Sequence, residues 1–102
     1  MSQIVFTGTT QPPNSEARNV GNTSGQVAAV AQASGTGTWQ ATFRYAPVSA
    51  SDVLGTASTM VVTNAAPKAE EAKFTPHAAF VGWWTVDSGT VDLNSLRGVL
   101  VG

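Results

Sequence analysis

The segment Thr36–Tyr45 alternates between two kinds of side chain, and this pattern limits the possible folds more than any other part of the chain. Successive side chains of an extended strand point to opposite faces, whereas a helix would scatter both sets. Gly35 and Gly37 flank the start of the alternation and Pro47 follows it, as is typical of strand ends. The pattern predicts a half-buried β-strand with an apolar face (Trp39, Ala41, Phe43, Tyr45) and a polar face (Thr38, Gln40, Thr42, Arg44).

The chain has 102 residues and no cysteine, which indicates one domain that is stabilised by an apolar core. A chain of this length can bury roughly two-thirds of its unfolded surface, enough for a sandwich or a barrel. Without cysteine, disulfides and thiolate metal sites are excluded. Short strand-like segments between turn residues recur, so we expect an all-β fold: an antiparallel β-sandwich or jelly-roll-like domain with a flexible N-terminal arm.

Residues 1–25 are predicted to form an extended N-terminal strand and arm, and residues 26–102 the β-sandwich domain. Gln3–Phe6 suits a short strand, whereas Thr7–Gly25 is rich in Thr, Gly, Pro, Asn and Ser. Such a segment buries too little surface to fold alone. It either crosses the domain as a loop or becomes ordered on a neighbouring chain, and the second is our expectation. The residues predicted to make that contact are Pro12, Pro13 and Val20.

Three segments outside the Trp39 strand have patterns that need interpretation. Gln26–Ala33 is rich in alanine, but it is short and its alternation favours a strand over a helix. Ala65–Thr75 carries the densest charge of the chain and is predicted to be a solvated loop or one exposed helical turn. Asp87–Gly89 has the composition of a turn and is predicted to close a hairpin. Further strands are expected over Thr56–Asn64, Ala78–Val86 and Gly98–Val101.

The charged fraction of the chain is 11%, less than half of the roughly 25% that is typical of soluble domains. The net charge of −1 gives no attraction to nucleic acid or anionic lipid, so neither is an expected partner. A neutral surface of small residues suits protein–protein contact, because each desolvated charge is costly; many small β-proteins share this composition without such a role. The N-terminus lacks the pattern of a secretory signal, and no apolar run is long enough for a membrane helix, so we expect a soluble product of the cytoplasm.

No group of residues in the sequence predicts catalysis, a cofactor or a metal site. His77 is the only histidine and has no partner at metal-ligand spacing, so we interpret it as structural or exposed. Paired carboxylates of a glycosidase must face each other across a cleft. The adjacent Glu70 and Glu71 are expected to diverge into solvent, and Asp87 and Asp92 flank the predicted hairpin. An enzyme is therefore the last of the functional hypotheses.

The tryptophans are the side chains that separate protein binding from sugar binding. Alternation predicts that Trp39 and one of the neighbours Trp83 and Trp84 lie in the core, while the other faces outward. An outward tryptophan is a good anchor for a protein interface, whereas a flat exposed pair would favour stacking on sugar rings. The residues expected between the two sheets are Trp39, Phe43, Val61 and Phe80.

Two short motifs carry a resemblance to a known group of proteins. Gly35-Thr36-Gly37-Thr38-Trp39 followed by alternating residues, and Ser88-Gly89-Thr90-Val91 after an aromatic strand, resemble the small β-sandwich domains of tailed-bacteriophage virion proteins. The similarity covers residues 35–91 and departs from the pattern at 48–56, where an Asp-Gly turn and another aromatic residue would stand. The resemblance implies a structural role in the virion.

From these observations together we expect a capsid decoration (cement) protein that binds between major capsid subunits, stabilises the head and is located in the virion. The expected partners are the major capsid protein or other virion subunits, and copies of the chain itself, with a trimer as one possible homo-oligomer. The expected interface residues are Pro12, Pro13 and Val20 with Trp83 or Trp84. The alternatives are a carbohydrate-binding β-module of a tail or adhesion protein, and a neck or tail adaptor.

Overall fold

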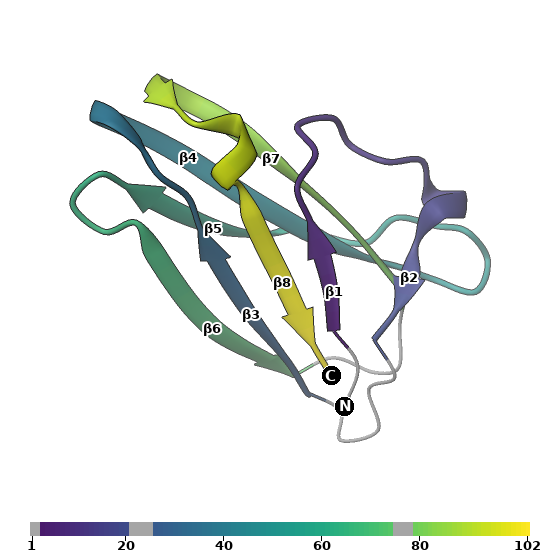
Figure 1. The fold of residues 1–102 in the computed structure, drawn as a ribbon. Helices are drawn as coiled ribbons and strands as arrows, with labels where there is room; N and C mark the ends of the chain where they lie inside the picture. The colour runs from purple at the N-terminus through teal and green to yellow at the C-terminus, as the bar shows by residue number, and fades with distance from the viewer. Residues whose placement is uncertain (1–2, 21–25, 75–78) are drawn as a thin grey trace.

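The computed structural model of the protein describes residues 3–20, 26–74 and 79–102. These residues form a β-sandwich of two four-stranded sheets, which confirms the predicted all-β fold class (Figure 1). Sheet A has the strand order β1-β8-β3-β6 and sheet B the order β2-β7-β4-β5, and every pairing is antiparallel. The strands are β1 (Gln3–Phe6), β2 (Arg18–Asn19), β3 (Gln26–Gln32), β4 (Gly35–Val48), β5 (Ser58–Thr63), β6 (Lys68–Phe74), β7 (Ala79–Val91) and β8 (Arg97–Val101).

Two 3₁₀ turns connect the strands, η1 (Asn14–Glu16) and η2 (Leu93–Ser95). Asp92 caps η2, because its carboxylate accepts a hydrogen bond from the backbone N–H of Asn94 at 3.0 Å. In the described parts of the chain, no helix is long and apolar enough to cross a membrane. The sandwich is elongated, with extents of 42 × 24 × 20 Å, and its long direction follows β4 and β7.

The core lies between the two sheets and is built around β4. The predicted inward face of this strand is confirmed, because Trp39, Ala41, Phe43 and Tyr45 are all buried. The ring of Phe43 is fully buried, and its centroid lies 5.3 Å from that of Trp84 and 6.1 Å from that of Phe6. Alternation thus fixes which face of β4 is covered, and the opposite sheet supplies the cover.

The prediction that Val61 of β5 lies between the two sheets was wrong. Val61 is 49% exposed, whereas its neighbours Met60 and Val62 are buried. The register explains this: Met60 pairs with Phe43 and Val62 with Ala41, so these residues share the inward face of β4, and Val61 opposite Thr42 faces outward. The other three residues expected between the sheets, Trp39, Phe43 and Phe80, are buried as predicted.

The predicted hairpin at Asp87–Gly89 was also wrong, because β7 continues through these residues to Val91. The pairing of β7 with β4 passes from Ala41–Val86 to Gln40–Ser88, so Asp87 is an extra residue in a β-bulge. Gly89 has a φ of 74°, a conformation that glycine adopts without strain. The turn-forming residues bend the strand here instead of reversing it, since β4 supplies pairing partners as far as Gly35.

The charge-dense segment predicted to be a loop or helical turn at 65–75 contains strand β6. It pairs with β3 over the whole length of that strand, from Gln26–Phe74 to Gln32–Lys68. Lys68 and Glu70 are exposed at this edge of sheet A and form a 3.3 Å ion pair, while the alternate residues Ala69 and Glu71 are partly covered. Charges at an edge strand are common and do not indicate a loop. The strand expected at Gln26–Ala33 is confirmed as β3.

The segment after β1 contacts the sandwich of its own chain at both ends. The carbonyl of Gly8 accepts a hydrogen bond from the backbone N–H of Trp84 at 2.8 Å, and Arg18 pairs with Phe80. Val20 is fully buried. Figure 1 shows the intervening chain as a wide arc that leads through η1 to β2. The contact of this arm with a neighbouring chain stays a prediction, and residues 21–25 lie outside the described part of the chain.

Candidate protein-contact surface

The three tryptophans occupy three different environments. Trp84 is fully buried, and its Nε1–H donates a hydrogen bond to the Phe6 carbonyl at 3.1 Å. Trp39 is buried as well, and its backbone N–H donates to Asn64 Oδ1 at 3.2 Å. Trp83 points to the opposite face of β7 and is half-buried. One tryptophan of the pair therefore faces inward and the other outward, as alternation predicted, and there is no flat pair of exposed indoles among them.

Trp83 belongs to a small apolar cluster on the outer face of sheet B, which we call the Trp83 cluster. Its buried members are Ala46, Val48 and Val81, and its partly buried members are Ala17, Leu54 and Trp83. Ala17 follows η1, and Leu54 comes from the loop after β4, so two connecting segments cover this end of the sheet. Asn14 Nδ2–H donates to the Asp52 carbonyl at 3.0 Å and ties these two segments together.

The rest of the outer face of sheet B is mostly polar, with Val61 as an exposed apolar residue on β5. Arg44 Nη1–H donates to Thr85 Oγ1 at 2.6 Å across the β4–β7 pair. The Asp87 carboxylate accepts a hydrogen bond from Thr42 Oγ1 at 2.6 Å and one from Gln40 Nε2 at 3.2 Å. The bulge places the Asp87 carboxylate beside these two side chains, and it covers Thr42, which is buried. This is the usual pattern of an antiparallel sheet with one apolar and one polar face.

The outer face of sheet A departs from that pattern. Val5, Val99 and Val30 lie side by side on β1, β8 and β3, because Val99 pairs with Val5 on one side and with Val30 on the other. Their chain neighbours Ile4, Leu100 and Ala29 are buried in the core, so the three valines face outward. We call this set the valine row. Val99, between its two neighbours, is only 8% exposed.

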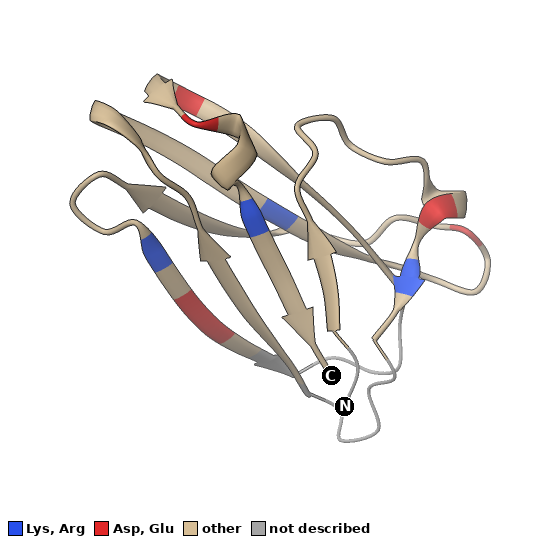
Figure 2. Cartoon of the chain, in the orientation of Figure 1, with Lys and Arg blue, Asp and Glu red and all other residues tan. Residues whose placement is uncertain are grey.

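The residues beside the valine row extend its apolar character. The adjacent row across the sheet contains Val101, Ala28 and Ala72, which follow one another in register on β8, β3 and β6. Charged side chains border the face: Arg97 at the start of β8, and Lys68 and Glu70 on the edge strand β6. Figure 2 shows how few Lys, Arg, Asp and Glu residues the sandwich carries and how widely they are spread. Sheet A therefore presents an uncharged centre with charges at its margin.

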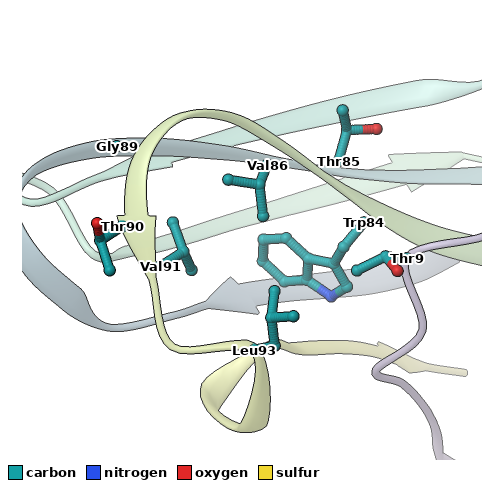
Figure 3. Close-up of a pocket in the computed structure, with 8 residues that line it drawn as sticks. All are labelled: Thr9, Trp84, Thr85, Val86, Gly89, Thr90, Val91 and Leu93. Atoms are coloured by element: carbon teal, nitrogen blue, oxygen red, sulfur yellow. The ribbon is translucent and has the colours of Figure 1, made fainter.

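A hollow of about 550 Å³ lies beside η2 and the end of β7 (Figure 3). The side chains that line it are apolar or hydroxylic, with Trp84 at its base and the 57% exposed Leu93 at its rim. The complete lining is Thr9, Trp84, Thr85, Val86, Gly89, Thr90, Val91 and Leu93. This set contains no group that titrates near neutral pH. Among the described residues, no cluster of His, Cys, Asp or Glu is arranged to hold a metal ion.

The Asp and Glu residues that were considered for catalysis make hydrogen bonds or ion pairs within the fold. Glu71 Oε1 accepts a hydrogen bond from the Tyr45 hydroxyl at 2.5 Å, which joins β6 of sheet A to β4 of sheet B. Burial, and then the hydrogen bond and charge of Glu71, raise the pKa of Tyr45 well above its usual value. Asp87 and Asp92 serve the bulge and the η2 cap, while Glu70 pairs with Lys68. His77 lies outside the described residues.

The predicted interface residues are not gathered on one surface. Pro13 is exposed and Pro12 is half-buried in the segment before η1, and Trp83 is half-buried on sheet B. Val20 and Trp84 are fully buried in the fold of their own chain, so their side chains present no surface to a partner. The interface role of Pro12, Pro13 and Trp83 stays a prediction. The valine row was missed, because its members come from three strands far apart in the sequence and only their pairing brings them together.

Comparison of the chain with protein-family models, with curated proteins and with solved structures gives no significant match.

Proposed function

We propose that this protein is a structural component of a tailed-bacteriophage virion, namely a capsid decoration protein that binds between major capsid subunits and stabilises the head. The observation that carries the proposal is the contrast between the two outer faces of the sandwich. On sheet B, hydrogen bonds join the outward polar side chains around Asp87 and Arg44, and Val61 is an isolated exposed valine. The outer face of sheet A has at its centre the valine row, in which Val99 is buried between the partly buried Val5 and Val30, where a solvated antiparallel sheet normally has polar side chains. An apolar centre with a charged margin is the arrangement of a protein interface.

The placement of the tryptophans supports protein contact over sugar binding. A carbohydrate platform needs exposed aromatic rings, and Trp39 and Trp84 are both buried. Trp83 is the single aromatic residue of the apolar Trp83 cluster, which suits an anchor in a protein interface. The low charged fraction of the chain also supports protein contact, because few charged side chains would have to be desolvated when a partner binds.

The proposal is tested by binding of the purified protein to intact phage heads, measured by cosedimentation. The informative variant is Val30→Lys, which places a charge at the β3 end of the valine row. Its matched control is Thr59→Lys, which adds the same charge to an exposed position on the outer face of sheet B. Because a charge buried in an interface is costly, we expect Val30→Lys to weaken binding at least tenfold and Thr59→Lys to leave it nearly unchanged.

Both variants are first compared with the unmodified protein by circular dichroism and urea unfolding, so that loss of binding is not loss of fold. Equal binding by the two folded variants would show that the valine row is not the contact. Failure of the unmodified protein to sediment with heads would overturn the decoration role itself.

A further inference from the structure

Strand β1 lies at the outer edge of sheet A and pairs with β8 alone. The register runs from Gln3–Val101 to Phe6–Gly98. Ile4 and Phe6 point between the sheets and are buried, so β1 fills core space although it is a short edge strand. The site that β1 occupies therefore has a backbone edge, supplied by β8, and an apolar interior.

The site is specific for the sequence of β1. The Phe6 ring lies 6.1 Å from Phe43, and the Phe6 carbonyl accepts the hydrogen bond of the buried Trp84 Nε1. Phe6 also lies directly over Gly82, where an added Cβ would come within 2.7 Å of Phe6 Cδ2. Without β1, the indole N–H of Trp84 and the edge of β8 would lose their partners. A strand that replaced β1 would need the same apolar pattern, with a large ring at the position of Phe6.

The segment that connects β1 to β2 is much longer than the distance between its two ends. Its two ends are fixed on β7, at Trp84 by Gly8 and at Phe80 by Arg18. The distance along β7 from Phe80 to Trp84 is about 13 Å, at about 3.3 Å per residue. The chain from Gly8 to Arg18 can extend to roughly 30 Å. The shorter extents of the molecule are 24 and 20 Å, so the connection is long enough to reach an adjacent copy.

We propose that β1 is an exchangeable strand, and that β1 of one copy occupies the β8–Trp84 site of a second copy of this chain. The exchanged form keeps the β1 contacts of the closed form, because the inserted strand has the same sequence. It gives up contacts of the connecting segment, such as the hydrogen bond from Asn14 to the Asp52 carbonyl. The two forms differ in the path of residues 9–17. Their balance depends on protein concentration, because a connection of this length presents its own strand at an effective concentration of about millimolar. Exchange is therefore favoured where copies are crowded to that concentration. The proposal concerns copies of this chain and does not depend on a virion role.

Single cysteines test the exchange directly, because the chain has no cysteine of its own. One chain carries Val5→Cys, and a second, isotope-labelled chain carries Val99→Cys. These positions are opposite each other in the β1–β8 pair. Opposite Cα atoms in antiparallel strands are about 4.5–5.5 Å apart, within the range of a disulfide. A disulfide between the two chains can thus form in register only when β1 of one lies on β8 of the other.

The two chains are unfolded together, refolded at about 1 mM and oxidised, and the mixed disulfide is measured by mass spectrometry. The control replaces Val99→Cys by Arg97→Cys, which is more exposed but is not a register partner of β1. We expect at least ten times more mixed disulfide for the Val5 and Val99 pair than for the Val5 and Arg97 pair. Equal yields would show random collision and would overturn the proposal.

A second measurement uses the unmodified chain and does not depend on the folding of the cysteine variants. The protein is refolded at about 1 mM and at a hundredfold lower concentration, and both samples are diluted and sedimented. Exchanged copies should remain associated after dilution, because separation requires Ile4 and Phe6 to leave the core. A monomeric mass in both samples would overturn the proposal.

Discussion

The neighbours Val61 and Val62 allow a matched test of how β5 packs, because the same substitution in one strand should have two very different effects. Val62 is fully buried and Val61 is 49% exposed. Val62→Ala removes two buried carbons, worth about 0.8 kcal/mol each, and leaves a small cavity beside Ala41. We expect it to lower the free energy of unfolding by about 2–3 kcal/mol. Val61→Ala removes the same atoms from a partly solvated face and should cost about 0.5 kcal/mol or less.

Urea unfolding, followed by tryptophan fluorescence, measures both effects. For a domain of this size the slope m is about 1–3 kcal/mol per molar urea, so Val62→Ala should lower the midpoint by about 0.7–3 M. Val61→Ala should leave the midpoint almost unchanged. Both variants should keep the m-value of the unmodified protein, which shows that the same surface is exposed on unfolding. An equal cost for the two substitutions, or a larger cost for Val61→Ala, would refute the register between β4 and β5.

Two further predictions concern the core and its edge. Phe43→Ala removes a fully buried ring that packs on Trp84, and urea unfolding should show a loss of about 3–5 kcal/mol; a loss below about 1 kcal/mol would contradict the packing. The raised pKa of Tyr45 means that this group favours the folded state fully below about pH 10, the unfolded value, and that this contribution is lost as the pH rises further. Stability should thus fall above about pH 10 more steeply than in Tyr45→Phe, and ultraviolet absorption, which reports this single tyrosine, should show ionisation only on unfolding.

Local alternation was enough to predict the parts of the fold that depend on one strand at a time. It identified the inward face of β4, the burial of Phe43, and the opposite orientations of Trp83 and Trp84. These predictions held because a side chain in a strand has only two directions, and a row of large apolar residues defines the covered one.

The predictions failed where the partner strand decides the structure. Residues 61 and 62 are both valine, so their side chains give no indication of which one faces the core. Only the pairing of Val62 with Ala41 shows that Val62 is the buried one. The residues Asp87–Gly89 suit a turn and a bulge equally, and the long partner β4 selects the bulge.

The candidate contact surface was beyond the sequence for the same physical reason. Val5, Val30 and Val99 are ordinary strand residues in three separate segments, and none has a local signal of exposure. Their meeting on the outer face of sheet A depends on the strand order β1-β8-β3. Trp83, in contrast, was found from the sequence, because the orientation of a tryptophan next to a buried one follows from alternation alone.

The copy number of this protein in purified virions is the most direct test of the proposal that it decorates a capsid. Particles are purified from an infected culture that produces the chain, and quantitative mass spectrometry compares its amount with that of the major capsid protein. A decoration protein should be present in a fixed, simple ratio to the capsid subunits, reproducible between preparations. Absence from intact particles, or a fixed number of only a few copies per particle, would contradict the decoration role.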